Sequence, residues 1–241
     1  MKLNETEAND WSEQRGRLCR ALGYRFIDEN HLLQALTHRS FGADNNERLE
    51  FLGDALLNLA IGAEVFRLRP KATEGDMSRL RASLVREETL ANVARRLPLA
   101  DAVRLGPGEL RSGGFRRNSI LADALEAVIG AVFLDGGHEP AAALCRRLLE
   151  PELTELPAAG SLKDPKTRLQ EALQAVPRPL PEYTVLREEG PPHRRRFSVR
   201  CRLPDSGEEV EAEGLSRRGA EQQAAERMLA QLQNQQENHH A

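Results

Sequence analysis

Residues 46–63 read NERLEFLGDALLNLAIGA, where apolar residues recur at three- and four-residue spacing and three acids interrupt them. At about 100° per residue around a helix, Glu50 and Asp54 fall within about 60° of Glu47. Near the opposite side of the helix lie Leu49, Leu52, Leu56, Leu59 and Ala63. The acids are flanked by further apolar residues, Phe51, Leu57 and Ile61. A helix that is apolar nearly all round predicts that its carboxylates lie within a packed structure or a cleft.

A second helical stretch, residues 120–134, reads ILADALEAVIGAVFL, and its only charged residues are Asp123 and Glu126. A carboxylate removed from water is costly unless a partner compensates its charge. Neither stretch offers a Lys or Arg beside its acids except Arg48, which points about 100° away from Glu47 on a helix. Mg²⁺ prefers oxygen ligands, and a few carboxylates from two facing helices can hold it. The two stretches together therefore predict a magnesium site.

Structural alternatives remain open for each stretch taken alone. The acids of residues 47–54 could form a solvated helix face, and Asp123 with Glu126 could be a purely structural pair. The occurrence of acids at helical spacing in both apolar stretches favours the metal site over two separate coincidences.

Composition limits the class of protein. The chain has 241 residues, of which 40% are apolar and 29% charged, as in soluble globular proteins. The sequence contains no run of about eighteen apolar residues, so no membrane-spanning helix is expected. The polar start MKLNETEANDW lacks the apolar core of a secretion signal. The widely spaced Cys19, Cys145 and Cys201 indicate a reducing cytoplasm. The net charge of −3 argues against a nucleic-acid partner unless acids and bases lie in separate parts of the chain.

The periodicity divides the chain into two domains. An all-α domain is predicted for residues 13–150, helical almost throughout from Leu18 to about Leu149, and a Pro-containing linker for residues 151–161. A small α+β domain of order α-β-β-β-α is predicted for residues 162–231, and a disordered polar tail for residues 232–241. Its elements are expected at residues 165–175, 183–187, 196–203, 208–214 and 218–231.

Residues 46–55, NERLEFLGDA, resemble the signature of bacterial ribonuclease III. The segments LTHRS at 36–40, EGDMS at 74–78 and GGFRR at 113–117 are similar to other blocks of that family. The resemblance runs from about residue 13 to residue 231, in the family's order and spacing.

This resemblance implies the roles of the acids. Mg²⁺, or Mn²⁺ as a substitute, would be held by Glu50, Asp54, Asp123 and Glu126. Glu47 and Glu74 would be accessory catalytic acids near the scissile strand. A homodimer would carry one site per strand of double-stranded RNA and would cut by two-metal-ion hydrolysis, leaving 5′-phosphate and 3′-hydroxyl ends. The family implies ribosomal RNA precursors and structured messenger RNAs as substrates. Of the six histidines, His38 lies nearest the acidic motif, and a neutral structural role is expected for it.

The second domain resembles a double-stranded RNA-binding domain. Residues 163–231 contain 13 Lys and Arg against 12 Asp and Glu, but six arginines gather between residues 187 and 202. Such domains read duplex shape, and the resemblance implies minor-groove contacts from Gln170, Glu171 and His193. Arg217 and Arg218, at a helix N-terminus, would bind the intervening phosphates.

Two alternative functions share parts of this pattern. A non-cleaving double-stranded RNA-binding regulator would be expected to lack a ligand carboxylate, yet all four are present. A metal hydrolase of nucleotides would have no use for a duplex-binding domain of about seventy residues.

Overall fold

The computed structural model describes residues 5–158, 160, 162–191 and 194–240. The chain divides into two compact units, Met1–Ala159 and Gly160–Ala241, which are described separately. The first unit is helical and the second has the order α-β-β-β-α, so both predicted fold classes are confirmed. Among the described residues, no helix combines the length and apolar character that a membrane span needs.

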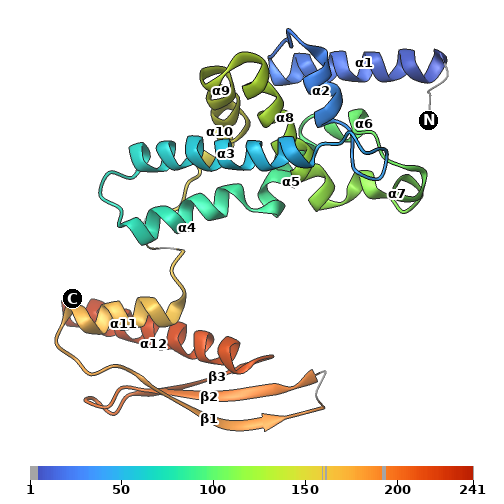
Figure 1. The fold of residues 1–241 in the computed structure, drawn as a ribbon. Helices are drawn as coiled ribbons and strands as arrows, with labels where there is room; N and C mark the ends of the chain where they lie inside the picture. The colour runs from blue at the N-terminus through green and yellow to red at the C-terminus, as the bar shows by residue number, and fades with distance from the viewer. Residues whose placement is uncertain (1–4, 159, 161, 192–193, 241) are drawn as a thin grey trace. The chain divides into compact units, whose positions relative to one another are not determined.

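The first unit consists of ten α-helices and one 3-10 turn over its described residues (Figure 1). The helices are α1 (Glu5–Leu22), α2 (Glu29–Ala35), α3 (Glu47–Leu68), α4 (Glu74–Val85), α5 (Glu87–Arg95), α6 (Leu99–Ala102), α7 (Pro107–Arg111), α8 (Asn118–Gly136), α9 (His138–Leu148) and α10 (Glu150–Thr154). The 3-10 turn, η1 (Gly114–Arg116), leads into α8.

Helix α8 forms the centre of this unit. It contacts α2, α3, α5 and α9, and 11 of its 19 residues are buried. A helix so enclosed has few positions at which a charged side chain reaches water. Asp123 and Glu126 are therefore unusual, because charged residues seldom occur on a helix that is mostly buried.

The face that α3 buries does not follow from its sequence pattern. Leu49, Leu57 and Ile61 are buried, as are Gly53, Ala60 and Val65. Leu59 is 60% exposed and Ala63 is also exposed, although both lie with the buried Leu49 on the side of the helix opposite Glu47. Because α3 is apolar nearly all round, the periodicity alone could not identify the side that α8 covers.

The helical unit extends beyond both predicted boundaries. Helix α1 begins at Glu5, and Trp11 anchors it by donating from Nε1 to the Ala102 carbonyl oxygen at 2.8 Å. Helix α10 takes up residues 151–154 of the predicted linker, and Arg96 pairs there with Glu152 at 2.6 Å. These contacts join residues far apart in the sequence, which a local pattern does not reveal.

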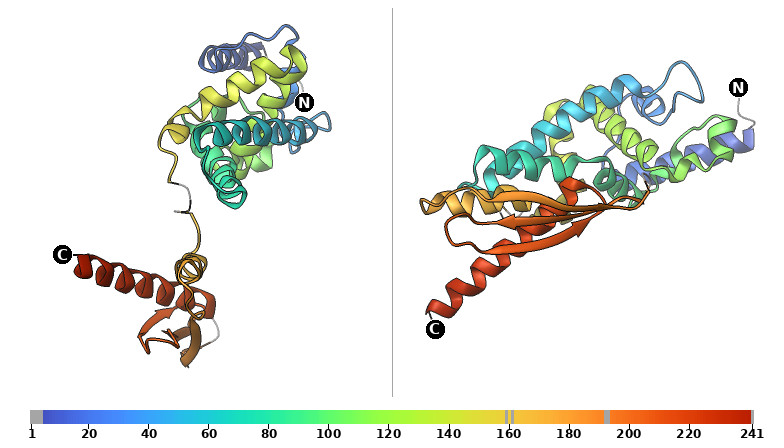
Figure 2. Two further views of the ribbon diagram at one scale, coloured as in Figure 1. Left: turned by 90° about the vertical axis from the view of Figure 1, so that its left-hand side faces the viewer. Right: turned by 90° about the horizontal axis from the view of Figure 1, so that it is seen from below.

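The second unit consists of α11 (Pro165–Ala175), β1 (Glu182–Glu189), β2 (Arg196–Arg202), β3 (Glu209–Gly214) and α12 (Arg217–His240). The strands form an antiparallel sheet of order β1-β2-β3, with Tyr183 opposite Cys201 and Cys201 opposite Val210. Both helices lie on one face of the sheet (Figure 2). Their contact with it forms a core that includes Leu169, Leu173 and Met228.

Helix α12 is longer than predicted. The sequence indicated an end near Gln231 and a disordered tail over residues 232–241, whereas the helix continues to His240. Gln235 donates to the Glu208 carboxylate at 2.6 Å, which ties this extension to the residue just before β3.

Candidate metal centre and RNA-binding surface

Two glycines let α3 and α8 cross with their backbones in contact. A Cβ atom on Gly53 would lie 1.8 Å from the Glu126 carbonyl oxygen. A Cβ atom on Gly130 would lie 2.3 Å from the Leu49 carbonyl oxygen. Any larger residue at either position would therefore force the helices apart. This close crossing brings together acids that are about seventy residues apart in the sequence.

Three acids meet at the crossing. Carboxylate oxygens of Glu50, Asp123 and Glu126 all lie within 4.8 Å of one another, and each side chain is partly buried. Burial raises the pKa of Glu126 to about 8, with further contributions from Asp54, Asp123 and Glu50. Burial also raises the pKa values of Glu50 and Asp123. Like charges held this close repel one another, and a divalent cation between them would remove the repulsion.

Asp54 lies at the edge of this group. It is exposed one helical turn beyond Glu50, and Asn58 donates to its Oδ1 atom at 2.8 Å. Its charge is the largest contribution after burial to the raised pKa of Glu126, so it acts on the same cluster. The structure thus brings three of the four predicted ligands together and holds the fourth beside them.

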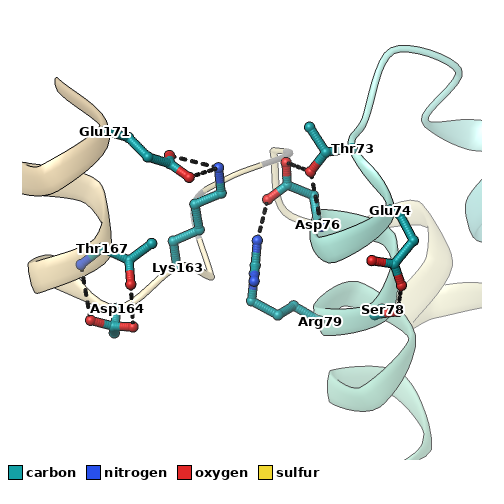
Figure 3. Close-up of polar contacts among 9 residues, drawn as sticks. All are labelled: Thr73, Glu74, Asp76, Ser78, Arg79, Lys163, Asp164, Thr167 and Glu171. Atoms are coloured by element: carbon teal, nitrogen blue, oxygen red, sulfur yellow. Dashed lines mark hydrogen bonds and ion pairs between the residues drawn. The ribbon is translucent and has the colours of Figure 1, made fainter. Parts of the chain in front are cut away.

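Of the two accessory acids, only Glu47 adjoins the cluster. It lines a cavity of about 480 Å³ together with Glu50 and Asp123, and Arg39 pairs with it at 3.4 Å. Glu74 begins α4, where Ser78 donates to its carboxylate at 2.8 Å (Figure 3). It lines a different cavity of about 370 Å³, beside Phe66 and Met77. Within one chain, Glu74 is therefore not part of the acidic group.

The cavity beside the cluster has a cationic wall that the sequence pattern does not indicate. Arg39 and Arg117 line it, and Arg117 pairs with Glu109 at 2.6 Å. His38 and Ser40 complete that wall. Arg39 and Arg117 lie within the LTHRS and GGFRR segments, but nothing in their local spacing links them to the acids.

An apolar stripe runs along the exposed side of α3. Phe51, Leu59 and Phe66 are 80%, 60% and 70% exposed. At about 100° per residue they lie within about 80° of one another on the helix, and Asp54 lies about 60° from Phe51. The apolar stripe therefore borders the acidic cluster directly.

The predicted RNA-binding residues of the second unit lie on α11 and at the start of α12. Gln170 and Glu171 are exposed on α11, and Lys163 pairs with Glu171 at 2.7 Å (Figure 3). Arg217 and Arg218 are both exposed at the start of α12. His193 lies outside the described residues.

A chain of ion pairs joins the two helix starts. Glu221 of α12 pairs with Lys166 of α11 at 2.7 Å and with Arg217 at 2.9 Å. Arg218 makes no ion pair with any residue that the structure describes. Of the two arginines, Arg218 is thus the one whose charge is unopposed.

Comparison with known proteins gives consistent matches to both units. Residues 28–153 match the Ribonuclease-III-like family, and residues 165–232 match the double-stranded RNA binding motif. The chain is 54% identical over 216 residues to Ribonuclease 3 of Alkalilimnicola ehrlichii, covering 90% of this chain and 95% of that protein. It is 51% identical over 218 residues to Ribonuclease 3 of Vibrio cholerae, covering 90% and 97%.

A solved structure resembles the first unit. The nuclease domain of ribonuclease III from Campylobacter jejuni, described for flexibility in a region involved in dimer formation, superposes with a TM-score of 0.55. It is 48% identical, and the match covers 56% of this chain and 95% of that one.

Proposed function

Because this chain belongs to the ribonuclease III family, whose members cleave double-stranded RNA as endoribonucleases, we propose that its four clustered acids hold the magnesium ions of that reaction. Those acids are Glu50, Asp54, Asp123 and Glu126. The observation that carries the proposal is the group of three partly buried carboxylates whose oxygens lie within 4.8 Å of one another. An all-oxygen donor set on two rigid helices fits Mg²⁺.

The chain's own residues hold the reacting groups in position. The crossing at Gly53 and Gly130 holds the carboxylates in one place, so that little reorganisation is needed when RNA binds. Glu47 adds a further carboxylate to the cavity that Glu50 and Asp123 also line. When bound, magnesium supplies a more acidic water for attack on phosphorus and positive charge opposite the departing 3′ oxygen. The products are 5′-phosphate and 3′-hydroxyl ends.

The functional unit is a homodimer formed through the apolar stripe of Phe51, Leu59 and Phe66. Exposed apolar surface of this kind marks an interface. A two-fold dimer through α3 would bring the two acidic clusters to one groove, because the acids border the stripe. Each cluster would then face one strand of the duplex. Glu74 lines the cavity next to Phe66, which favours a role at this interface.

The second unit holds the duplex. Gln170, Glu171 and His193 would face the minor grooves, and Arg217 with Arg218 would bind phosphates. Ribosomal RNA precursors and structured messenger RNAs are the expected substrates, in the cytoplasm, where free cysteines such as Cys145 and Cys201 remain reduced.

The proposal is tested with a long RNA duplex on a denaturing gel. Cleavage is expected with Mg²⁺, none with a chelator, and recovery when Mg²⁺ is restored. Glu126→Gln keeps the shape of the side chain and removes its charge, so cleavage should fall about 100-fold or more while duplex binding persists.

Glu139→Gln is the matched control, since Glu139 is an exposed acid on α9. It should cleave at the normal rate. A Glu126→Gln variant that cuts as fast as this control at saturating Mg²⁺ would remove Glu126 from the metal site.

A further inference from the structure

The hydrogen bonds of His38 determine which ring nitrogen carries its proton. The backbone N–H of Ser40 donates to His38 Nδ1 at 3.2 Å. A backbone N–H can only donate, so Nδ1 accepts and carries no proton. The imidazole is therefore neutral, with its proton on Nε2.

Ser40 reinforces this tautomer with its side chain. Its Oγ atom lies 2.8 Å from His38 Nδ1 and accepts a hydrogen bond from the Gly106 backbone N–H at 2.9 Å. With the lone pair facing Gly106 occupied, the hydroxyl proton is free to point at Nδ1. Both donors of Ser40 thus converge on one nitrogen.

The surrounding backbone keeps these groups in register. His38 N–H donates to the Arg104 carbonyl oxygen at 3.1 Å, and Arg104 N–H donates to the Leu36 carbonyl oxygen at 2.7 Å. A Cβ atom on Gly106 would lie 2.1 Å from the Ser40 carbonyl oxygen, so only glycine permits this approach. The arrangement is built by two segments that are more than sixty residues apart.

The Nε2–H group is left as a donor beside the acidic cluster. The half-buried His38 ring lines the cavity of about 480 Å³ that Glu50 and Asp123 also line. No described residue accepts a hydrogen bond from Nε2. The two arginines of the cavity wall differ from His38, because Arg39 pairs with Glu47 and Arg117 with Glu109.

We propose that His38 donates a hydrogen bond from Nε2 to a non-bridging oxygen of an RNA phosphate in this cavity, and that Ser40 fixes the tautomer that makes this possible. The inference rests on the proposed metal site, since the phosphate is placed beside those acids. A neutral N–H suits this place, because it donates to a phosphate without pairing with the acids. His38 thereby aligns the RNA strand with the cluster.

The tautomer is measured directly by nitrogen-15 NMR on the full chain with labelled histidine, with and without Mg²⁺. The His38 signals, identified by their loss in His38→Gln, are expected to show a protonated Nε2 and a bare Nδ1. Ser40→Ala removes the hydroxyl donor but keeps the backbone N–H donor, so the Nε2-protonated ring should remain the major tautomer with a reduced share. A wild-type ring protonated at Nδ1 would overturn the proposal.

Single-turnover cleavage at saturating duplex and Mg²⁺ tests the phosphate contact. The amide nitrogen of Gln reaches the place of Nε2, whereas that of Asn reaches only the place of Nδ1. His38→Gln should therefore keep most of the rate, and His38→Asn should lose about ten- to a hundredfold, the effect of one hydrogen bond to a charged group. Duplex affinity without Mg²⁺ should be the same in both variants.

His31→Gln and His31→Asn are the matched controls, because His31 lines a different cavity. Both should cleave at the wild-type rate. Equal losses in His38→Gln and His38→Asn would indicate a merely structural histidine and overturn the proposal. A failure of the metal site would appear instead as normal cleavage by Glu126→Gln, with the His38 tautomer unchanged.

Discussion

Glu126 lies on α8, whose other residues are mostly buried, and its carboxyl group is close to three other acids. The protonation of this carboxyl group couples the metal site to the stability of the fold. Its folded-state pKa of about 8 is well above the ordinary value of 4.5. The folded chain without metal therefore holds a proton at Glu126 that the unfolded chain releases between these pH values.

The metal-free protein should consequently lose stability as pH rises from about 5 to 8. The folded state binds more protons in this window, so raising the pH favours the unfolded state. Urea unfolding in a chelator at pH 6 and pH 8 measures the effect. Glu126→Gln should reduce the loss, and Glu139→Gln should show the full loss. Equal pH dependence in all three proteins would contradict the assignment of the raised pKa to Glu126.

His38 shows how a residue can be predicted correctly in one respect and incompletely in another. Its neutral state was expected from the sequence, and the hydrogen bond from Ser40 N–H agrees with it. The position of its free N–H depends on Gly106, which is distant in the sequence. The residues next to His38 in the sequence therefore give no indication that its side chain lines the cavity.

At the scale of the elements, the crossing of α3 and α8 determines whether a site exists. Gly53→Ala should separate the helices, because its new Cβ atom would lie 1.8 Å from the Glu126 carbonyl oxygen. A loss of about 1–3 kcal/mol in the free energy of unfolding is expected, as for other overpacked cores, together with weakened metal-dependent cleavage.

Gly16→Ala on α1 is the control for this substitution. Its Cβ atom would meet only the Arg20 side chain at 3.5 Å, so helix propensity should dominate and stability should rise by up to about 1 kcal/mol. Urea denaturation measures the free energy of unfolding of both variants. A Gly53→Ala protein as stable as Gly16→Ala would show that the two helices tolerate a wider crossing.

At the scale of the whole molecule, the apolar stripe predicts the assembly. Leu59→Ser with Phe66→Ser removes two large apolar side chains from each copy, each contributing about 1.5–3 kcal/mol when buried. The dimer should dissociate into monomers at micromolar concentration in analytical ultracentrifugation. Ile27→Ser is the control, because Ile27 is 87% exposed but lies outside the stripe. A double variant that sediments like this control would refute the proposed interface.

The two arginines at the start of α12 should determine much of the affinity for duplex RNA of any sequence. Replacing Arg217 and Arg218 by Ala should make the plot of log affinity against log salt shallower by roughly one to two units. Arg218 should account for most of this change, because Arg217 already pairs with Glu221. Filter binding across a salt series measures the slope, with Arg20→Ala on α1 as the control. An unchanged slope in the double variant would show that these arginines do not meet phosphates.

Local patterns in the sequence were sufficient for the two-domain plan and for most elements. The predicted helix at 165–175 and the three strands agree with the structure to within a few residues. The acids at positions 50, 123 and 126 could be selected because an acid in an apolar helix is visible at a spacing of three or four residues. Helical periodicity and charge placement are local properties, and neighbouring residues alone define them.

Three-dimensional packing was needed for the rest. Contacts between distant segments determine which face of α3 is buried and how its acids meet those of α8. They also position Ser40 for its hydrogen bonds to His38. Because α3 is apolar nearly all round, the close approach at Gly53 and Gly130 determines which of its sides α8 covers. Such contacts depend on shape and backbone hydrogen bonds, and neither is expressed in the spacing of residue types along one helix.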